Sequence, residues 1–332
     1  MAVRRLRGAV VDASTLLGKE LAEELNDSTA AVWDLTLLDG AEVGGQITSA
    51  GEEVLVIKTV SADAFEGIDV VFFAGQAATA REFWKAAHAA GASIVDLTGA
   101  LEGMPGVLLR SAWSETAERP DLATIAVVAS HPMSAVLALI ETRLRPLGLK
   151  RLVATVLLPA SELGSAGVDE LQQQAVGLLT FKPLQKDVYD AQVAFNLLTA
   201  LGGAAELDLE KTRSTIVRQT VALGAGVDLL ALQLVQAPVF HGYTASVFAE
   251  MASGVDETDV RKVLLGGILK AAEDVAPSNE SAAGGGEVLV SLRKSDGGFW
   301  LWMAADNLGL LAKNAAGCAQ ELASLRPPGP VN

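Results

Sequence analysis

The stretch at residues 124–147, TIAVVASHPMSAVLALIETRLRPL, decides the fold. Residues 124–129 form a continuous apolar run that predicts a buried strand, and after a short turn an apolar helix is predicted to run to Leu144. In an α/β protein, such a turn joins the carboxyl end of a central strand to the amino end of a helix, where backbone N–H groups and the helix dipole favour an anion or a nucleophile. The turn contains Ser130, His131, Pro132, Met133 and Ser134. It therefore has the position for covalent chemistry but contains no thiol.

The composition of the 332-residue chain excludes several function classes. Its formal charge of −15 disfavours nucleic acid as a partner, because a polyanion needs a basic surface. We find no run of about eighteen apolar residues, so no membrane span is predicted. The single cysteine, Cys318, excludes an internal disulfide and fits a reducing cytoplasm. The three histidines and this cysteine show no ligand spacing, so no metal site is predicted.

The first hundred residues alternate between strand and helix patterns, which predicts an α/β, Rossmann-like doubly wound domain with a parallel sheet. The predicted strands cover residues 8–11, 35–38, 54–57, 69–73 and 93–97, and the predicted helices cover residues 16–25 and 79–90.

The first turn of this domain departs from a dinucleotide-binding turn. Such a turn carries three glycines, which let the backbone approach the pyrophosphate and the helix pack on the strand. Here the three positions hold Asp12, Thr15 and Gly18. Only the glycine that serves packing is present, and a carboxylate at Asp12 would repel a pyrophosphate. Either a weakened cofactor site or a purely structural domain is compatible with this pattern.

Asp39 follows the second predicted strand at the place where an acid would bind the ribose of a cofactor. In that role it favours NAD over NADP, because a 2′-phosphate would be repelled. The alternative is a solvated acid in an Asp-Gly turn.

After Leu147 the pattern changes to an α+β second domain with a mixed, largely antiparallel sheet. The predicted strands cover residues 151–158, 228–236, 243–251, 288–293 and 299–306, and the predicted helices cover residues 168–181, 209–222, 258–271 and 308–325. The last helix carries Cys318 on its apolar face, so this thiol is predicted to be a buried hydrophobe and not a reactive group.

Five segments, in order, resemble the aspartate-semialdehyde dehydrogenase family over essentially the whole chain. They read VVDASTLLGKEL, VVFFAGQAATAREF with GASIVDLTGAL, LLPASELGSAGVDEL, LVQAPVFHGYTASV and AADNLGLLAKNAAG. The segment VQAPVF is similar to that of the family's cysteine-less Usg-type branch. The resemblance implies a Rossmann-like NAD-binding-type domain at residues 1–130 with 306–332, an α+β substrate and dimerisation domain at residues 131–305, and a homodimer.

The family's reaction, as the resemblance implies, is the NADP-linked reductive dephosphorylation of an aspartyl phosphate through a cysteine thioester. Carried over by position, four of the family's groups are replaced: the nucleophilic cysteine by Met133, its neighbouring glutamine by Leu158, the substrate arginine by Gln236 and the proton-transfer histidine by Tyr243, with His241 two residues upstream. The phosphate-binding arginine is missing where Glu102 and Gly103 stand. Retained candidates are Gly18, Ala74, Gly75 and Asn307 for a cofactor, and Glu210 and Arg213 for a substrate.

These replacements favour a catalytically degenerate, dimeric binding or scaffold protein, which binds NAD or no cofactor. The alternative enzyme is an NAD-linked oxidoreductase acting on a small acyl or aldehyde substrate, and a third reading is that the parent activity survives. The alternative enzyme would use side chains that flank the two family segments, namely Ser130, His131, Ser134, His241 and Tyr243. Each also has a structural interpretation: Ser134 as a helix N-cap, His131 and His241 as loop and turn residues, and Tyr243 as a half-buried aromatic.

Overall fold

The computed structural model describes residues 5–29, 31–50, 53–224, 229–272 and 275–325. The chain forms two compact units, and each is described by itself. Unit 1 contains residues 1–130 and 311–332, and unit 2 contains residues 131–310. The chain passes from unit 1 to unit 2 between Ser130 and His131, inside the turn that the sequence singles out.

Unit 1 contains a seven-stranded sheet in which every strand pair is parallel. The strand order is β5-β2-β1-β6-β7-β9-β8. The strands are β1 (Arg5–Val11), β2 (Val32–Asp39), β5 (Lys58–Thr59), β6 (Val70–Phe73), β7 (Ser93–Asp96), β8 (Val107–Arg110) and β9 (Ala126–Ala129). A separate antiparallel pair is formed by β3 (Ile47–Ala50) and β4 (Glu53–Val56). The predicted doubly wound fold is confirmed.

Helices cover both faces of this sheet, in keeping with its inner strands β6, β7 and β9, which are buried at every position. On one face, Leu6 and Val10 of β1 belong to a cluster with α1 (Leu16–Asn26) and with the residues of α8 (Asn307–Ser324) that lie in unit 1. On the other face, Ala9 and Val11 belong to a second cluster with α2 (Ala77–Ala89). Cys318 lies in the first cluster and is fully buried.

Unit 2 contains a six-stranded mixed sheet in the order β11-β10-β12-β15-β14-β13. The strands are β10 (Leu149–Leu158), β11 (Leu230–Gln236), β12 (Tyr243–Met251), β13 (Leu269–Ala271), β14 (Val288–Ser295) and β15 (Gly298–Ala305). Only β10–β11 and β13–β14 are parallel among these described pairs. The largely antiparallel second sheet is therefore confirmed.

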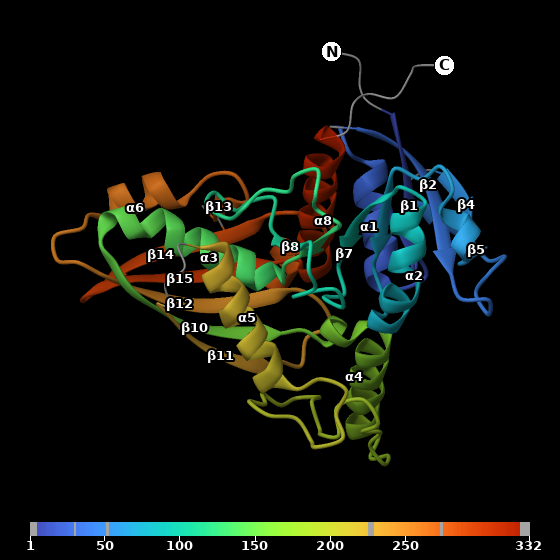
Figure 1. Ribbon diagram of the computed structural model, residues 1–332. Coiled ribbons are helices and arrows are strands. Elements are labelled where there is room, and N and C mark those ends of the chain that lie inside the picture. Colours follow the sequence, from blue (N-terminus) through green and yellow to red (C-terminus); the bar gives the residue numbers. More distant parts are fainter. Residues whose placement is uncertain (1–4, 30, 51–52, 225–228, 273–274, 326–332) are drawn as a thin grey trace. The chain divides into compact units, whose positions relative to one another are not determined.

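One face of the second sheet is covered by α3 (Pro132–Leu144), α5 (Leu209–Leu223) and α6 (Glu257–Leu264), as Figure 1 shows. Next to β11 the chain forms α4 (Gly164–Leu179) and a long irregular segment that returns to the strand at Leu198. Buried Glu170 and Gln174 of α4 hold this segment by accepting the N–H groups of Val188 and Val193, at 2.6 and 2.8 Å.

Several predicted elements need correction. The helix predicted at 258–271 ends at Leu264, because Gly266 and Gly267 adopt positive φ angles and the chain then enters β13. The strand β8 was not predicted, and it makes β9 the second strand from the edge and not a central one. The strand predicted at 54–57 is part of the separate pair β3–β4. The predicted start of β11 at Asp228 lies outside the described residues.

Candidate functional site

The helix α3 is positioned by His131, which is its N-cap in place of the predicted Ser134. The imidazole Nδ1 accepts the N–H of Met133 at 3.1 Å, and the backbone N–H of His131 donates to Gln219 Oε1 of α5 at 2.9 Å. Because Nδ1 is an acceptor, the ring hydrogen must lie on Nε2. The start of the helix therefore selects one tautomer of the neutral imidazole.

The Nε2 atom of His131 faces Glu162, which follows β10 in a short 3-10 turn (Ala160–Leu163). The Nε2–Oε1 distance is 3.1 Å, and the phenol of Tyr243 donates to Glu162 Oε2 at 2.6 Å. The phenol oxygen also lies 3.4 Å from Nε2, and the two ring centroids are 5.7 Å apart. Three residues distant in sequence thus form one closed network in unit 2.

Charge in this network resides on Glu162. Burial alone would raise the pKa of Glu162, but the hydrogen bonds from His131 and Tyr243 outweigh it and lower the pKa overall. Burial, together with the charge of Glu162, raises the pKa of Tyr243 well above its usual value of 10.0. The network therefore contains the Glu162 carboxylate, which accepts from the neutral phenol of Tyr243 and from the imidazole of His131. Neither donor has a proton to release to a substrate without breaking its bond to Glu162.

Met133, which the sequence resemblance led us to expect at the nucleophile position, lies in the first turn of α3 and is 2 % exposed. Ser134 follows it, and its hydroxyl is buried without a hydrogen-bond partner among the described residues. Neither side chain belongs to the network of His131, Glu162 and Tyr243. Ser130 lies in unit 1, where its carbonyl accepts the Asn314 side-chain amide at 3.4 Å.

Gln236, which the sequence resemblance led us to expect in place of a substrate arginine, is a fully buried amide. Its Nε2 donates to the carbonyls of Leu158 and Ala237, at 3.1 and 3.2 Å. Residues 158 and 236 are therefore in contact, through uncharged hydrogen bonds that join the end of β10 to the end of β11. The site has no guanidinium at this position for a substrate carboxylate.

Of the remaining predicted residues in unit 2, His241 is exposed, and its carbonyl accepts the Asn279 side-chain amide at 2.9 Å. Asn307 is buried and its Oδ1 accepts the Gly242 N–H at 2.8 Å and the Ser161 hydroxyl at 3.1 Å. Asn307 therefore orients the loop before Tyr243. The interpretation of Tyr243 as half-buried is wrong, because its side chain is 3 % exposed.

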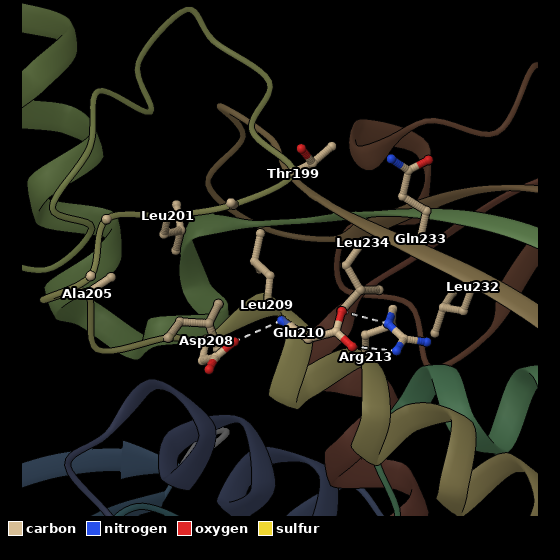
Figure 2. Close-up of a pocket in the computed structure, with 14 residues that line it drawn as sticks. Thr199, Leu201, Ala205, Asp208, Leu209, Glu210, Arg213, Leu232, Gln233 and Leu234 are labelled. Atoms are coloured by element: carbon tan, nitrogen blue, oxygen red, sulfur yellow. Dashed lines mark hydrogen bonds and ion pairs between the residues drawn. The ribbon is translucent and has the colours of Figure 1, made fainter.

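Glu210 and Arg213 line a cavity of about 590 Å³ between the start of α5, the loop before it and β11 (Figure 2). Arg213 donates to both carboxylate oxygens of Glu210, through Nε at 2.8 Å and through Nη2. Asp208 caps α5 by accepting the Glu210 and Lys211 N–H groups. The pair lies two turns along α5 from Gln219, or roughly 9 Å of helix rise, so it is not part of the His131 network.

In unit 1, the turn after β1 is held together by its own side chains. Asp12 has a φ of +60°, in the left-handed region, and its Oδ2 accepts the Gln76 N–H at 2.6 Å. Thr15 caps α1, since its Oγ1 accepts the Gly18 N–H at 3.0 Å. A Cβ at Gly18 would overlap the Asp12 carbonyl, so this glycine serves close packing as predicted.

Asp39 is buried and not solvated. Its two carboxylate oxygens accept the N–H groups of Ser14 and Gly40, each at 2.8 Å. Ala74 and Gly75 follow β6 beside Asp12, and a Cβ at Gly75 would overlap the Asp12 side chain. Burial, the largest influence, raises the pKa of Asp12, and the hydrogen bond from Gln76 opposes it.

Sequence reasoning missed two residues of the site, Glu162 and Gln219. Glu162 stands in the quoted segment LLPASELGSAGVDEL, two residues before the first of its two glycines, and its charge shortly after an apolar strand was the signal that could have singled it out. Gln219 lies on the buried side of α5, where a polar side chain is itself unusual.

Within the described ranges, no group of three or more His, Cys, Asp or Glu side chains is arranged to hold a metal ion. In the same part of the chain, no helix is long and apolar enough to cross a membrane.

Comparison with known proteins places both units in one family. Residues 7–140 match the NAD-binding domain of semialdehyde dehydrogenases, and residues 142–309 match their dimerisation domain. A USG-1 protein homolog of Pseudomonas aeruginosa is 34% identical over 263 residues, which are 78% of each chain. A USG-1 protein homolog of Azotobacter vinelandii is 32% identical over 334 residues, which are 96% of each chain.

A solved structure shares the whole fold. It is that of a probable aspartate-semialdehyde dehydrogenase from Pseudomonas aeruginosa, with a TM-score of 0.83 and 29% identity, over 96% of this chain and 99% of that one. With both domain matches and relatives of this similarity, the chain belongs to the semialdehyde dehydrogenase family.

Proposed function

We propose that this protein is a dimeric member of the semialdehyde dehydrogenase family that has lost the parent reaction and acts by binding. One observation carries this proposal. The nucleophile position is a buried thioether, Met133, and the polar groups next to it, His131, Glu162 and Tyr243, satisfy one another.

A thioether cannot form a thioester, because its sulfur is already alkylated. Loss of the nucleophile alone costs on the order of a million-fold in a covalent mechanism. A buried carboxylate, Glu162, near the same helix start also disfavours a phosphate or a second carboxylate. The amide of Gln236, in place of a guanidinium, also weakens the binding of an anionic substrate, since a neutral amide offers it no opposite charge.

The test is an assay for NADP-dependent and NAD-dependent oxidation of aspartate semialdehyde in the presence of phosphate. A cysteine-containing aspartate-semialdehyde dehydrogenase is the positive control. We expect no formation of reduced nucleotide above the rate without protein. Phosphate-dependent turnover would refute the proposal, and oxidation of other small aldehydes with NAD would favour the alternative oxidoreductase.

A homodimer is proposed from the open face of the second sheet and from the match of residues 142–309 to a dimerisation domain. Val153, Phe248 and Trp300 stand directly opposite one another on neighbouring strands, so their side chains share one face. Val153 is 43% exposed and Trp300 is 37% exposed, and Trp302, on the same face, is 39% exposed. A second copy of the chain, laid on this face, would remove these apolar side chains from water.

Sedimentation velocity tests the dimer. We expect a dimer at micromolar concentration and a shift to monomer for Trp302→Glu, whereas Leu122→Glu, which changes an exposed residue of unit 1, leaves the dimer intact. A monomeric wild type would refute the assignment.

The binding role is assigned to the cavity beside Glu210 and Arg213. The bidentate contact with Glu210 orients the guanidinium of Arg213, whose remaining N–H groups fit a ligand carboxylate. Glu210 fits an ammonium group, so the pair suits a small zwitterion such as an amino acid. Thermal-shift screening with free amino acids should give a hit that Arg213→Gln abolishes. Arg261→Gln, which breaks the comparable pair with Glu257 on α6, should leave it unchanged. An unaltered hit in Arg213→Gln, or none in the wild type, would refute this assignment.

If a dinucleotide enters unit 1, the carboxylate of Asp39 favours NAD over NADP. The chain's single cysteine and acidic charge fit a cytoplasmic protein.

A further inference from the structure

The sheet of unit 1 has a topological switch point between β1 and β6. From β1 the chain continues outward through β2 and β5, and from β6 it continues in the opposite direction through β7. In doubly wound folds a dinucleotide lies across the crevice at this point, above the carboxyl ends of the two strands. The residues that border it here are Asp12–Thr15 after β1 and Ala74–Gln76 after β6.

Two side chains cross this crevice. The Asp12 carboxylate reaches from the first turn to the Gln76 N–H at 2.6 Å. The hydrogen of the Thr15 hydroxyl is shared between the Asp12 carbonyl at 2.8 Å and, across the crevice, the Ala74 carbonyl at 3.1 Å. Gly75 packs so closely on Asp12 that it has no room for a Cβ. The two loops that a dinucleotide would separate are therefore in direct contact.

The N–H groups of the first turn are also occupied. Ser14 donates to the Asp39 carboxylate at 2.8 Å, Thr15 to the Asp12 carbonyl at 3.2 Å, and Gly18 to the Thr15 hydroxyl at 3.0 Å. An anion site at a helix N-terminus depends on N–H groups that point at the ligand. Here three of these N–H groups already donate to oxygens of the chain itself, so they do not point at a ligand.

The side chain of Asp12 is well suited to replace an anionic ligand. It is 6 % exposed, and Gln76, the N-cap of α2, makes no capping hydrogen bond with its own side chain. The carboxylate of Asp12 therefore supplies the negative charge that favours a helix N-terminus. The residues do not fit the NAD(P) that the family match implies, because a pyrophosphate would have to displace this charge and break the bonds on both sides of the crevice.

We infer that the switch-point crevice of unit 1 is closed to NAD and NADP, with the Asp12 carboxylate holding the N-terminus of α2 in place of a pyrophosphate and Thr15 joining the two loops. This inference goes beyond the loss of turnover. It concerns unit 1 alone and does not depend on Met133 or on the network in unit 2.

The experiment is a calorimetric titration of the full-length protein with NAD and with NADP, up to about 1 mM, where binding of roughly −4 kcal/mol becomes measurable. The double variant Asp12→Gly/Thr15→Gly restores glycine at both altered positions of the turn. Asp190→Gly is the matched control, since Asp190 in unit 2 also has a positive φ, 47°, and also accepts a backbone N–H, that of Ala204.

We expect no binding by the wild type or by Asp190→Gly, and a gain of at least about tenfold in NAD affinity for the double variant, with NADP weaker because of Asp39. Wild-type binding of either nucleotide that is measurable in this range, up to about 1 mM, would overturn the inference. A folded double variant that binds no better than wild type would overturn it too, since these two residues would then not be what closes the crevice.

If the double variant does not fold, Asp12→Gly alone is titrated, and a gain in NAD affinity is again required. The aldehyde assay separates this inference from the proposed loss of catalysis. Binding of NAD without turnover contradicts only the closed crevice, whereas turnover contradicts the proposed function.

Discussion

Replacing Glu162 by glutamine tests the network around His131 most directly. Glu162→Gln keeps the shape of the side chain but leaves one acceptor oxygen where the carboxylate has two. The Tyr243 phenol can keep this oxygen, and the new NH2 group then faces the Nε2–H of His131. The imidazole cannot move its hydrogen to Nδ1, because Nδ1 accepts the Met133 N–H at 3.1 Å.

The size of the effect follows from these two bonds. A hydrogen bond to a charged group contributes about 1.5–3 kcal/mol net. The variant loses one such bond and converts the other, from Tyr243, into a neutral one. The side chains of His131 and Glu162 are each only 15% exposed, so solvent screening weakens the hydrogen bond between them only a little. We expect a loss of about 3 kcal/mol in the free energy of unfolding of unit 2, or a Tm lower by about 6–12 °C for a unit of this size.

Differential scanning calorimetry and urea titration measure the change. The matched control is Glu210→Gln, which removes the same charge from a side chain that is 70% exposed and also bound by two nitrogens. We expect the control to stay within about 0.5 kcal/mol of wild type. If Glu162→Gln is as mild as Glu210→Gln, the reasoning about the network is refuted.

The pH dependence gives a second check. The folded-state pKa of Glu162 is lowered from its ordinary value of 4.5. The carboxylate therefore contributes stability that is fully present above pH 4.5 and is lost as the pH falls through the lower, folded-state pKa. The difference between wild type and Glu162→Gln should be constant near neutral pH and shrink in acid. A difference that stays unchanged in acid would contradict the assignment of this stability to the Glu162 carboxylate.

Three further predictions concern other parts of the chain. Asp12→Ala should lower the free energy of unfolding by about 2 kcal/mol, because the variant loses the hydrogen bond to Gln76 and keeps an unfavourable positive φ. Asp12→Gly removes the backbone strain and should lower it by less than half as much. Equal losses of both variants in urea titration would contradict this reasoning. Burial, with the charge of Glu321, raises the pKa of Cys318 to about 12. A disulfide reagent at pH 8 should therefore label the folded protein at least about 100-fold more slowly than the unfolded protein. Comparable labelling rates would contradict the buried position of Cys318. Met133→Cys should restore a thiol without restoring phosphate-dependent aldehyde oxidation, because Gln236 still replaces the substrate arginine; activity in the nucleotide-reduction assay would show that the nucleophile alone was missing.

Most of the fold could be predicted from the sequence, because apolar periodicity is a local signal. The apolar strands β6 and β7 of unit 1 and the amphipathic α5 were predicted close to their observed bounds. The errors arose where a local signal was ambiguous. Residues 258–271 have helical spacing, but Gly266 and Gly267 end the helix, and the short strand β8 has no alternation that marks it.

The candidate site could be predicted only in part. The sequence shows that positions 133 and 236 lack a thiol and a guanidinium, since residue identity needs no structure. It does not show what replaces them. Glu162 was not among the predicted residues, and Asp39 was interpreted either as a ribose-binding acid or as a solvated one, whereas its carboxylate binds the N–H groups of Ser14 and Gly40.

The sequence by itself determined the fold class, the family and the absence of a thiol at position 133 and of a guanidinium at position 236, because these depend on residue types and on spacings within single elements. Only the tertiary structure decided the two closed arrangements. His131 meets Glu162 and Tyr243 across 31 and 112 residues of chain, and Asp12 meets Gln76 across 64. A hydrogen bond forms between atoms that the fold brings within about 3 Å, and sequence separation carries no information about that distance.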